Sequence, residues 1–330
     1  MKALPPREPL GFFPTPLHPL PRLSAHLAAS RGGPRLWIKR DDLTGFALGG
    51  NKVRKLEFFL GAARAAGADV LLTAGGQQSN HARITAAAAA RTGLDCILVL
   101  SGGRPAAYTS NLALDRLFGA QVRFVQTGPE RMPALHALAE ELRAAGRRPL
   151  VIPIGGSTPL GALGYVEAAR EVAGQLRAAG VSGGPATPLT IVHGSSSGGT
   201  QAGLVVGCQT AELAARVIGV SADETRADLT RMVADIVGPL ADDVGVARPS
   251  SEAIEVFDDY VGAGYGIPTA ASEKASELFA RLEGIALDAT YGAKAGAGLL
   301  DLIRRGVLNA TDTVVFWHTG GATWHRPVPG

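Results

Sequence analysis

Short apolar runs alternate with alanine- and leucine-rich stretches of helical length along almost the whole chain. Runs such as DVLLTA and DCILVL are apolar at consecutive positions, which is typical of strands buried on both faces of a parallel sheet. Strands are predicted at 35–39, 69–74, 95–100, 121–126, 149–154, 189–194, 216–221 and 313–318, and helices at 52–66, 80–92, 131–145, 161–179 and 199–214. This alternation predicts an α/β fold in which helices cover parallel sheets.

Composition narrows the class of protein without identifying it. The 330 residues are 46% hydrophobic and 18% charged, which fits one large or two medium globular domains. The net charge is only +3 and no Lys/Arg run forms a basic stripe, so a nucleic-acid partner is not expected. The proline-rich start does not resemble a signal peptide, and no run of 18 apolar residues suggests a membrane span, so we expect a cytoplasmic protein.

Metal and disulfide chemistry find little support in the sequence. Cys96 and Cys208 lie inside apolar runs, where buried core thiols are more common than disulfides or metal ligands. The seven histidines show no ligand spacing with cysteines or carboxylates. We therefore expect no metal.

Candidate chemistry lies in the loops that follow the predicted strands, since ligands of α/β folds collect at the carboxyl ends of strands. The loop HGSSSGGTQAG (193–203) opens a helix with hydroxyls and glycines, an arrangement suited to a phosphate or carboxylate. No lysine follows these glycines, and G-x-G-x-x-G is absent. A nucleotide-binding oxidoreductase fits the alternation but lacks this fingerprint.

Two further loops stand out, AGGQQSNHAR (74–83) and HTGGAT (318–323). In the first, Ser79 or Asn80 is a natural N-cap for the helix that follows. Free backbone amides there would suit a substrate carboxylate. His81 by itself is more typical of a structural histidine than of a catalyst.

The six lysines, at positions 2, 39, 52, 55, 274 and 294, limit the candidates for amine chemistry. Lys52 directly follows a Gly-Gly-Asn turn at the start of a predicted helix. The helix N-terminus and nearby cations would lower its pKa toward that of a reactive amine. From these residues alone, a surface lysine and a reactive amine remain comparable readings. We expect Lys39 in an ion-paired strand end, Lys274 on a solvated helix face and Lys294 at a helix start.

Taken together, these segments resemble one enzyme family. In order along the chain they are KRDD, GGNKVRKLEF, TAGGQQSNHAR, GSSSGGTQAG and HTGG, and they are similar to the D-cysteine desulfhydrase and 1-aminocyclopropane-1-carboxylate (ACC) deaminase family. Members of that family are pyridoxal-phosphate (PLP) enzymes with the tryptophan-synthase β-like fold, fold type II. The resemblance extends from about residue 12 to residue 324. It implies a two-domain α/β fold with parallel-rich twisted sheets.

The resemblance also implies how the molecule is divided. A large PLP-binding domain would comprise residues 1–49 and 161–330, and a small domain, residues 50–160, would be inserted into it. PLP would lie between the two domains. The substrate would be a small amino acid, and the enzyme would be a homodimer.

By the same resemblance, Lys52 would carry PLP as a Schiff base and act as the general base at the substrate α-carbon. Asn80 would hydrogen-bond the 3′-oxygen of PLP, and Thr319 would share a hydrogen bond with its ring nitrogen. The phosphate would be bound by Ser197, Gly198, Gly199 and Thr200.

The substrate carboxylate would be bound by Ser79 and the amides of Asn80 and His81, with Gln78 beside them. Tyr265 and Tyr291 match the two active-site tyrosines of the family. In isolation, each tyrosine would instead be interpreted as a half-buried ring with its hydroxyl at water.

One position departs from both subfamilies. Gly292 follows Tyr291, where ACC deaminases have a glutamate facing the ring nitrogen and desulfhydrase-like members have a threonine. We expect this glycine to leave more room near the leaving group. Loss of the acid disfavours ACC ring opening and favours β-elimination, with D-cysteine as the leading substrate and pyruvate, ammonia and hydrogen sulfide as products.

Several alternatives remain open from the sequence. L-Cysteate, with sulfite as the leaving group, is the next substrate, followed by ACC; β-chloroalanine and D-serine are also possible. A hypothesis of another class is a non-catalytic PLP-binding or anion-binding protein on the same fold.

Overall fold

The computed structural model describes residues 4–181, 183–184 and 187–321, and it contains two separate sheets. Each of the eight predicted strands is confirmed to within two residues at either end. Two short strands, β1 (Leu17–Pro19) and β9 (Glu255–Phe257), were not predicted. At three residues each, they are too short to give a periodic signal.

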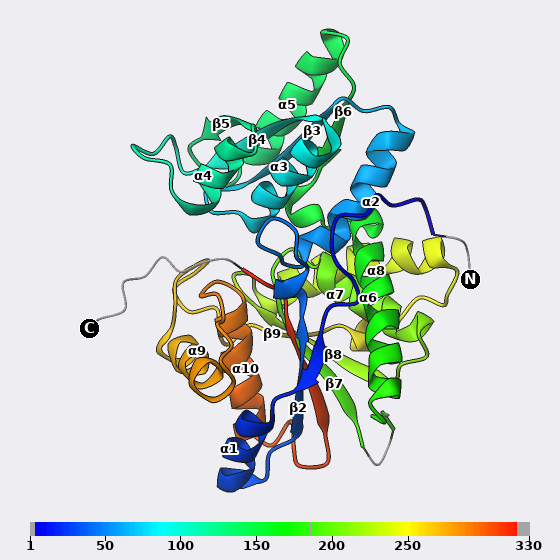
Figure 1. The fold of residues 1–330 in the computed structure, drawn as a ribbon, viewed down its shortest axis with the longest axis vertical. Coiled ribbons are helices and arrows are strands. Elements are labelled where there is room, and N and C mark those ends of the chain that lie inside the picture. The colour runs from blue at the N-terminus through cyan, green and yellow to red at the C-terminus, as the bar shows by residue number, and fades with distance from the viewer. Residues whose placement is uncertain (1–3, 182, 185–186, 322–330) are drawn as a thin grey trace.

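The larger sheet has the strand order β1-β2-β10-β7-β8-β9, and β1 is antiparallel to its neighbour while all other pairs are parallel. Its remaining strands are β2 (Arg35–Arg40), β10 (Thr313–His318), β7 (Leu189–Ser195) and β8 (Ala215–Ser221). Figure 1 shows helices on both faces. They are α6 (Pro159–Ala178), α7 (Gly199–Thr210) and α8 (Arg226–Val244) on one face, and α1 (Pro21–Arg31), α9 (Ala270–Glu283) and α10 (Gly292–Arg304) on the other.

The central strand β10 explains why its sequence is apolar at every position. Val315 and Trp317 pack into the core beneath α6, α7 and α8, whereas Val314 and Phe316 pack into the core beneath α1, α9 and α10. Successive side chains of a strand point to opposite faces, so a strand covered on both sides needs apolar residues throughout.

The smaller sheet is entirely parallel, with the order β5-β4-β3-β6. Its strands are β3 (Val70–Gly76), β4 (Asp95–Ser101), β5 (Gln121–Val125) and β6 (Pro149–Ile152). One face is covered by α2 (Lys52–Ala65), α3 (Asn80–Thr92) and α4 (Ser110–Leu117), and the other by α5 (Arg131–Ala144). The expected helices at 52–66, 80–92 and 131–145 are thus confirmed.

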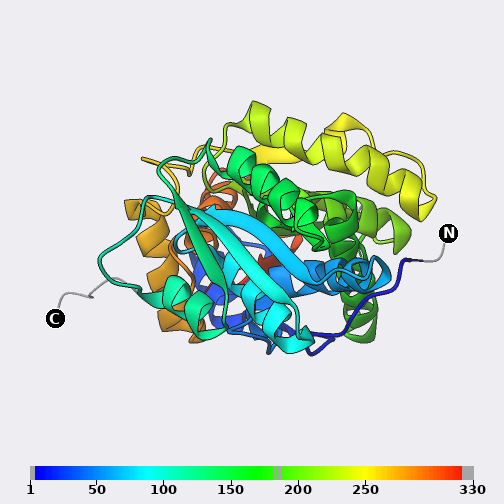
Figure 2. The ribbon, with the colours of Figure 1, turned by 90° about the horizontal axis from the view of Figure 1, so that it is seen from above.

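The two sheets lie one above the other (Figures 1 and 2), and α2 crosses the junction between them. The chain passes between the two sheets twice, and a single-turn helix lies on each passage: η1 (Asp41–Leu43) between β2 and α2, and η2 (Ile154–Gly156) between β6 and α6. A third, η3 (Ser251–Ala253), precedes β9. The carboxyl ends of β3, β7 and β10 all reach this junction, because residues that follow each of them line the same cavity. The fold therefore brings the three loops singled out from the sequence to one place.

Cys96 and Cys208 are buried free thiols, as expected. Within residues 4–181, 183–184 and 187–321, no cluster of His, Cys, Asp and Glu has the arrangement of a metal site. No helix in that part of the chain is both long enough and apolar enough to cross a membrane.

Candidate active site

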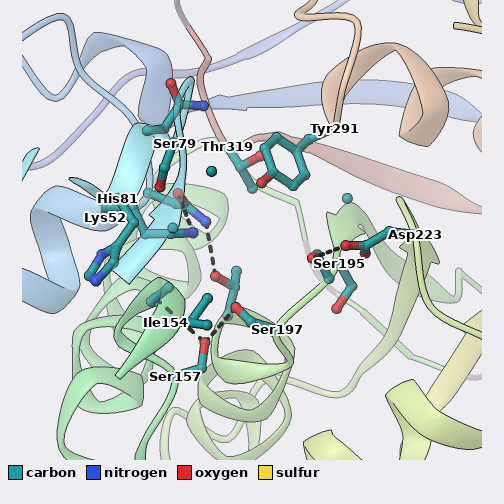
Figure 3. A pocket seen from close by; sticks show the side chains of 18 of the residues that line it. Lys52, Ser79, His81, Ile154, Ser157, Ser195, Ser197, Asp223, Tyr291 and Thr319 are labelled. Carbon is teal, nitrogen blue, oxygen red and sulfur yellow. Dashed lines mark hydrogen bonds between the residues drawn. The ribbon is translucent and has the colours of Figure 1, made fainter. Parts of the chain in front are cut away.

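A cavity of about 600 Å³ lies between the two sheets. Figure 3 shows Lys52 and His81 on one side of it, Tyr291 and Thr319 opposite them, and Ser157 and Ser197 below. Most of the candidate residues from the sequence line it: Lys52, Ser79, Asn80, His81, Ser197, Gly198, Thr200, Tyr265, Tyr291 and Thr319. These residues come from several different loops and helix ends, so it is the tertiary fold that brings them to one cavity.

Two candidates do not line the cavity. The Gln78 side chain is engaged elsewhere, because its Oε1 accepts from Asn111 N (3.0 Å) and its Nε2 donates to Thr109 O (3.2 Å). Gly199 lies just behind the wall, where its amide donates to Ser157 Oγ (3.3 Å). In this conformation Gln78 fixes the start of α4 instead of facing the cavity.

Lys52 is the first residue of α2, as the sequence predicts. The turn before it needs glycine, because Gly49 has φ +70° and a Cβ there would lie 2.1 Å from Asp42 O. Lys52 Nζ donates to Asn51 Oδ1 (3.2 Å). Burial lowers the pKa of Lys52 to about 8, and the Asp288 carboxylate opposes this shift. The lowered pKa agrees with the expectation, but burial causes it and neighbouring cations do not.

Lys55, one turn further along α2, is fully buried and points to another part of the cavity wall. Its Nζ donates to Gly155 O (3.1 Å) and Ser157 Oγ (3.2 Å). Burial and the charge of Lys52 hold its pKa well below the usual range. The two lysines therefore have different tasks, although they lie three residues apart.

The loop at the N-terminus of α7 forms an anion cradle. Ser157 Oγ lies 2.7 Å from Ser197 Oγ, and Asn51 Nδ2 donates to Thr200 Oγ1 (3.1 Å). Gly155 is required here, because a Cβ would lie 2.4 Å from Ser197 Oγ. Hydroxyls, first-turn amides and a helix dipole converge on this end of the cavity, which suits a phosphate group.

The N-terminus of α3 supplies a second polar wall. Ser79 is confirmed as the N-cap, since its Oγ accepts from Ala82 N (3.2 Å). Asn80 Oδ1 accepts from Arg83 Nη1 (2.9 Å) and Asn111 Nδ2 (3.0 Å). Because both contacts require an acceptor, the Asn80 amide orientation is fixed and its Nδ2 remains to donate into the cavity.

His81 has a structural hydrogen bond despite lining the cavity. Its Nε2 lies 2.9 Å from Thr73 Oγ1, and that hydroxyl already donates its proton to Ile152 O (2.7 Å). Nε2 must therefore carry the ring proton. Burial holds the pKa of His81 well below its usual range, so the ring is neutral at physiological pH.

The two tyrosines form a hydroxyl pair. Tyr265 Oη and Tyr291 Oη are 2.6 Å apart, and the rings meet edge to face. Burial raises the pKa of both phenols, of Tyr291 well above the usual value, so both keep their protons at neutral pH. Since one hydroxyl donates to the other, one proton of the pair remains available to the cavity.

The expectation that Gly292 opens space near the leaving group is wrong. Gly292 is buried behind the cavity wall, and a Cβ there would lie 2.9 Å from Asp288 Oδ1. Asp288 accepts from the amides of Thr290 (3.1 Å), Tyr291 (2.9 Å) and Gly292 (2.8 Å). The glycine therefore accommodates the carboxylate that caps α10 instead of enlarging the cavity.

Thr319 follows β10 and joins this wall to the start of α2. Its carbonyl accepts from Asn51 N (2.7 Å), so the loop that carries Lys52 is attached to the end of the central strand. Both HTGG glycines of this loop line the cavity and have positive φ, Gly320 at +82° and Gly321 at +146°. Residues of the motif beyond Gly321 lie outside the described part of the chain.

Several lining residues were not identified from the sequence, among them Asn51, Arg131, Ser157 and Asp223. Ser157 lies in IGGSTP, which follows β6 and precedes α6 in the same strand–glycine–helix arrangement as the loops that were chosen. Asp223 follows β8 and accepts from Ser196 Oγ (3.1 Å). The rule that ligands collect at the carboxyl ends of strands would have found both.

The remaining lysines have structural surroundings. Lys39 is ion-paired, as expected, but its partner is Glu171 of α6 and not the neighbouring aspartates. Lys274 is exposed on α9. Lys294 lies in the first turn of α10, as expected, and is fully buried.

Comparison with known proteins agrees with this geometry. A family model described as "Pyridoxal-phosphate dependent enzyme" matches residues 9–320. A D-cysteine desulfhydrase of Klebsiella pneumoniae subsp. pneumoniae is 43% identical over 324 residues, covering 96% of this chain and 94% of the relative. One from Salmonella choleraesuis is 42% identical with the same coverage.

Solved structures give the same result for the fold. A crystal structure of an ACC deaminase homologue superimposes with a TM-score of 0.85 at 37% identity, covering 96% of this chain and 92% of the other. A crystal structure of a threonine deaminase superimposes with a TM-score of 0.66 at 21% identity, covering 95% of this chain and 94% of the other.

Proposed function

The chain belongs to the family of pyridoxal-phosphate dependent enzymes, and from that premise we propose that it is a D-cysteine desulfhydrase, which releases hydrogen sulfide, ammonia and pyruvate. Its fold is fold type II of PLP enzymes. The substrate rests on relatives of that name at 42–43% identity over 96% of the chain. The observation that carries the chemistry is a partly buried amine of lowered pKa, Lys52, in one cavity with an anion cradle.

The side chains that line the cavity suit the functional groups of PLP. The hydroxyls of Ser157, Ser197 and Thr200 converge at the start of α7 and suit a phosphate. Asn80 Nδ2 is oriented as a donor toward the cavity and suits the 3′-oxygen. Lys52 lines the same cavity, with Ser157 and Ser197 below it in Figure 3, and its amine suits the aldehyde carbon.

Bound PLP supplies an electron sink that makes a substrate α-proton acidic. Lys52 is the residue that we propose for moving this proton. A pKa of about 8 leaves a useful fraction of neutral amine at physiological pH, whereas an exposed lysine would be almost entirely protonated. Its hydrogen bond to Asn51 Oδ1 keeps the amine directed along the cavity.

The substrate carboxylate is assigned to the start of α3. The amides of Asn80 and His81 belong to the first helical turn, where no carbonyl partner exists within the helix. The positive end of the helix dipole favours a negative charge there. Ser79 contributes its hydroxyl beside these amides.

Departure of the β-substituent leaves a thiolate that needs a proton. The Tyr265–Tyr291 pair keeps both phenolic protons at neutral pH and has one of them free for the cavity. We assign this pair to the β-carbon side of the substrate, where it would donate to the departing sulfur. Asp288, the carboxylate beside Gly292, accepts from three amides at the start of α10 and does not line the cavity, so it does not take the place of the glutamate of ACC deaminases.

We further propose how the chain is divided into domains, how it assembles and where it acts. The cofactor would lie between a large domain, 1–49 with 161–330, and a small domain, 50–160; the parts of this division at residues 1–3, 182, 185–186 and 322–330 lie outside the described residues. The enzyme would be a homodimer, in keeping with the resemblance noted from the sequence. It would act in the cytoplasm on a small amino acid.

An assay panel tests the activity. Purified enzyme is incubated separately with D-cysteine, L-cysteine, L-cysteate, D-serine and ACC, and sulfide, sulfite, ammonia and keto acid are each measured. We expect equal amounts of sulfide, ammonia and pyruvate from D-cysteine. Sulfite from L-cysteate, or α-ketobutyrate from ACC, at higher kcat/KM than the D-cysteine reaction would replace the proposed substrate.

The Lys52→Ala variant controls this panel. It should lose turnover by at least about a thousandfold, because the group that moves the α-proton is absent. Lys274→Ala, on the exposed face of α9, should match the wild type. A coloured protein that turns over none of the five compounds would instead indicate a non-catalytic PLP-binding protein.

A further inference from the structure

Lys294 is buried completely and donates three hydrogen bonds to backbone carbonyls. Its Nζ lies 2.8 Å from Ala222 O, Val261 O and Gly264 O. An ammonium has three N–H donors, so these three acceptors use all of them. The contact joins three separate parts of the chain: the end of β8, the connection between β9 and α9, and the first turn of α10.

The location is unfavourable for a cation in other respects. Lys294 is the third residue of α10, and the positive end of a helix dipole disfavours an ammonium in the first turn. Burial also costs solvation free energy. The three carbonyls compensate for both effects. Removing the ammonium would therefore take one hydrogen-bond donor from each of these three oxygens.

Two of these carbonyls belong to a loop that has little to fix its conformation. The segment VGAGYG (261–266) contains Gly262, Gly264 and Gly266, with φ of +64°, +138° and +72°. Glycines in this region of φ have many accessible conformations in a free loop. Backbone hydrogen bonds of the segment are few and long, such as Ile267 N to Gly264 O (3.3 Å).

Residues beside the three carbonyls line the cavity. Tyr265 directly follows Gly264, Asp223 directly follows Ala222, and Tyr291 precedes Lys294 by three residues. Tyr265 is half exposed, and its hydroxyl meets that of Tyr291. The position of the Tyr265 hydroxyl therefore depends on where the loop backbone is held.

We propose that Lys294 is a positioning residue for the active site: its ammonium acts as an internal cation that holds the 261–264 backbone against Ala222 and so sets Tyr265 against Tyr291. Lys294 does not line the cavity. The catalytic consequence rests on the proposed function, whereas the consequence for the loop does not.

Hydrogen exchange tests the loop directly. Lys294→Ala and the matched variant Lys274→Ala are compared with wild-type enzyme, with peptides covering residues 258–268 as the readout. We expect exchange in this segment to be at least about tenfold faster in Lys294→Ala alone, since local opening there no longer breaks the two hydrogen bonds from Lys294 to Val261 O and Gly264 O. Unchanged exchange in the segment would overturn the proposal.

Chemical rescue separates donation by the ammonium from simple filling of space. Lys294→Ala lacks three methylenes and the amine, which n-propylammonium supplies. We expect n-propylammonium to slow the exchange of 258–268 and to restore activity, whereas n-propanol and tetramethylammonium should do neither. Equal rescue by n-propanol would contradict the proposal. If Lys294→Ala does not fold, Lys294→Met, which fills the space without an ammonium, replaces it in the exchange comparison with Lys274→Ala, and its thermal midpoint is the second readout; unchanged exchange of 258–268 in Lys294→Met would overturn the proposal.

A double-mutant cycle tests the link to Tyr265. Lys294→Ala should lower kcat/KM for D-cysteine by about tenfold or more in wild-type enzyme but by much less in the Tyr265→Phe background, because the hydroxyl to be positioned is already absent. Additive losses would mean that Lys294 acts elsewhere. If wild-type enzyme does not act on D-cysteine, the proposed function fails, and the exchange and rescue measurements still decide the role of Lys294.

Discussion

At the scale of single residues, Lys52 and Lys55 show how burial and neighbours assign different roles to identical side chains. Both lie at the start of α2 and both have lowered pKa values. Lys55 donates to Gly155 and Ser157, which are part of the anion cradle. Lys52 contacts only the Asn51 side chain among hydrogen-bond partners within the described residues, and its amine lines the cavity. Only Lys52 is therefore placed to react.

The pH dependence of cofactor attachment follows from the Lys52 pKa. Only the neutral amine attacks an aldehyde, and burial lowers the pKa of Lys52 to about 8. When PLP is added to enzyme stripped of cofactor, the rate at which the visible band forms should rise with pH and level off above about 8 to 9.

A blocked lysine, N-acetyl-lysine methylamide, serves as the control for this measurement. Its rate should keep rising beyond about pH 10, since its amine has the usual pKa. If the enzyme follows the same curve as the blocked lysine, then Lys52 is not the buried amine described above.

At the scale of elements, the start of α2 is fixed by a buried carboxylate. Asp41 directly follows β2 and is the first residue of η1. Its carboxylate accepts from Arg54 Nε (3.0 Å) and Nη2 (2.9 Å), Tyr165 Oη (2.6 Å), Trp317 Nε1 (2.9 Å) and Thr15 Oγ1 (2.9 Å). These partners come from α2, α6, β10 and the N-terminal segment. Arg54 is two residues after Lys52, so this cluster holds the turn that carries the proposed reactive amine from outside the cavity.

Asp41→Asn should therefore destabilise the enzyme strongly. An amide at this position presents N–H groups to a buried arginine, and breaking a buried ion pair costs about 3–5 kcal/mol. Asp42→Asn is the matched control, because the Arg40–Asp42 pair lies nearer the surface and should contribute less than about 1 kcal/mol. Urea denaturation of both variants measures the difference. Equal losses of unfolding free energy in the two variants would mean that the Asp41 cluster has no special role.

The same carboxylate gives the direction of acid sensitivity. Burial alone would raise the pKa of Asp41, but Arg54 and Lys39 lower it to about 2, below the value of about 3.9 for an unfolded chain. The ionised form thus stabilises the native state fully above about pH 4, and this contribution is lost as the pH falls toward 2.

At the scale of the whole molecule, the candidate active site is formed where the two sheets meet. The cavity is lined by residues from 49 to 321, and neither sheet alone provides both the amine and the tyrosines. The apolar runs predict the strands well, because strands covered on both faces must be apolar throughout, as β10 is. The loops after β3, β7 and β10 could be recognised from the sequence because they directly follow these predicted strands.

What the sequence could not predict depends on tertiary neighbours. The cause of the lowered Lys52 pKa is burial beneath other parts of the fold, which no local pattern reveals. From the sequence, we expected Gly292 to leave extra space in the cavity. In the structure its neighbour is the Asp288 carboxylate, a contact that is visible only once the start of α10 is folded. Lys294 read as an ordinary helical lysine, since its three carbonyl partners lie 30 to 72 residues away.

We propose that Lys52 is the amine that holds the cofactor. The most direct measurement is to reduce the coloured enzyme with sodium borohydride, digest it and locate the pyridoxyl group by mass spectrometry. We expect the label on the peptide containing Lys52, at Lys52 itself, and no label on the Lys52→Ala variant. A label on Lys55, or on any other lysine of the wild-type enzyme, would contradict it.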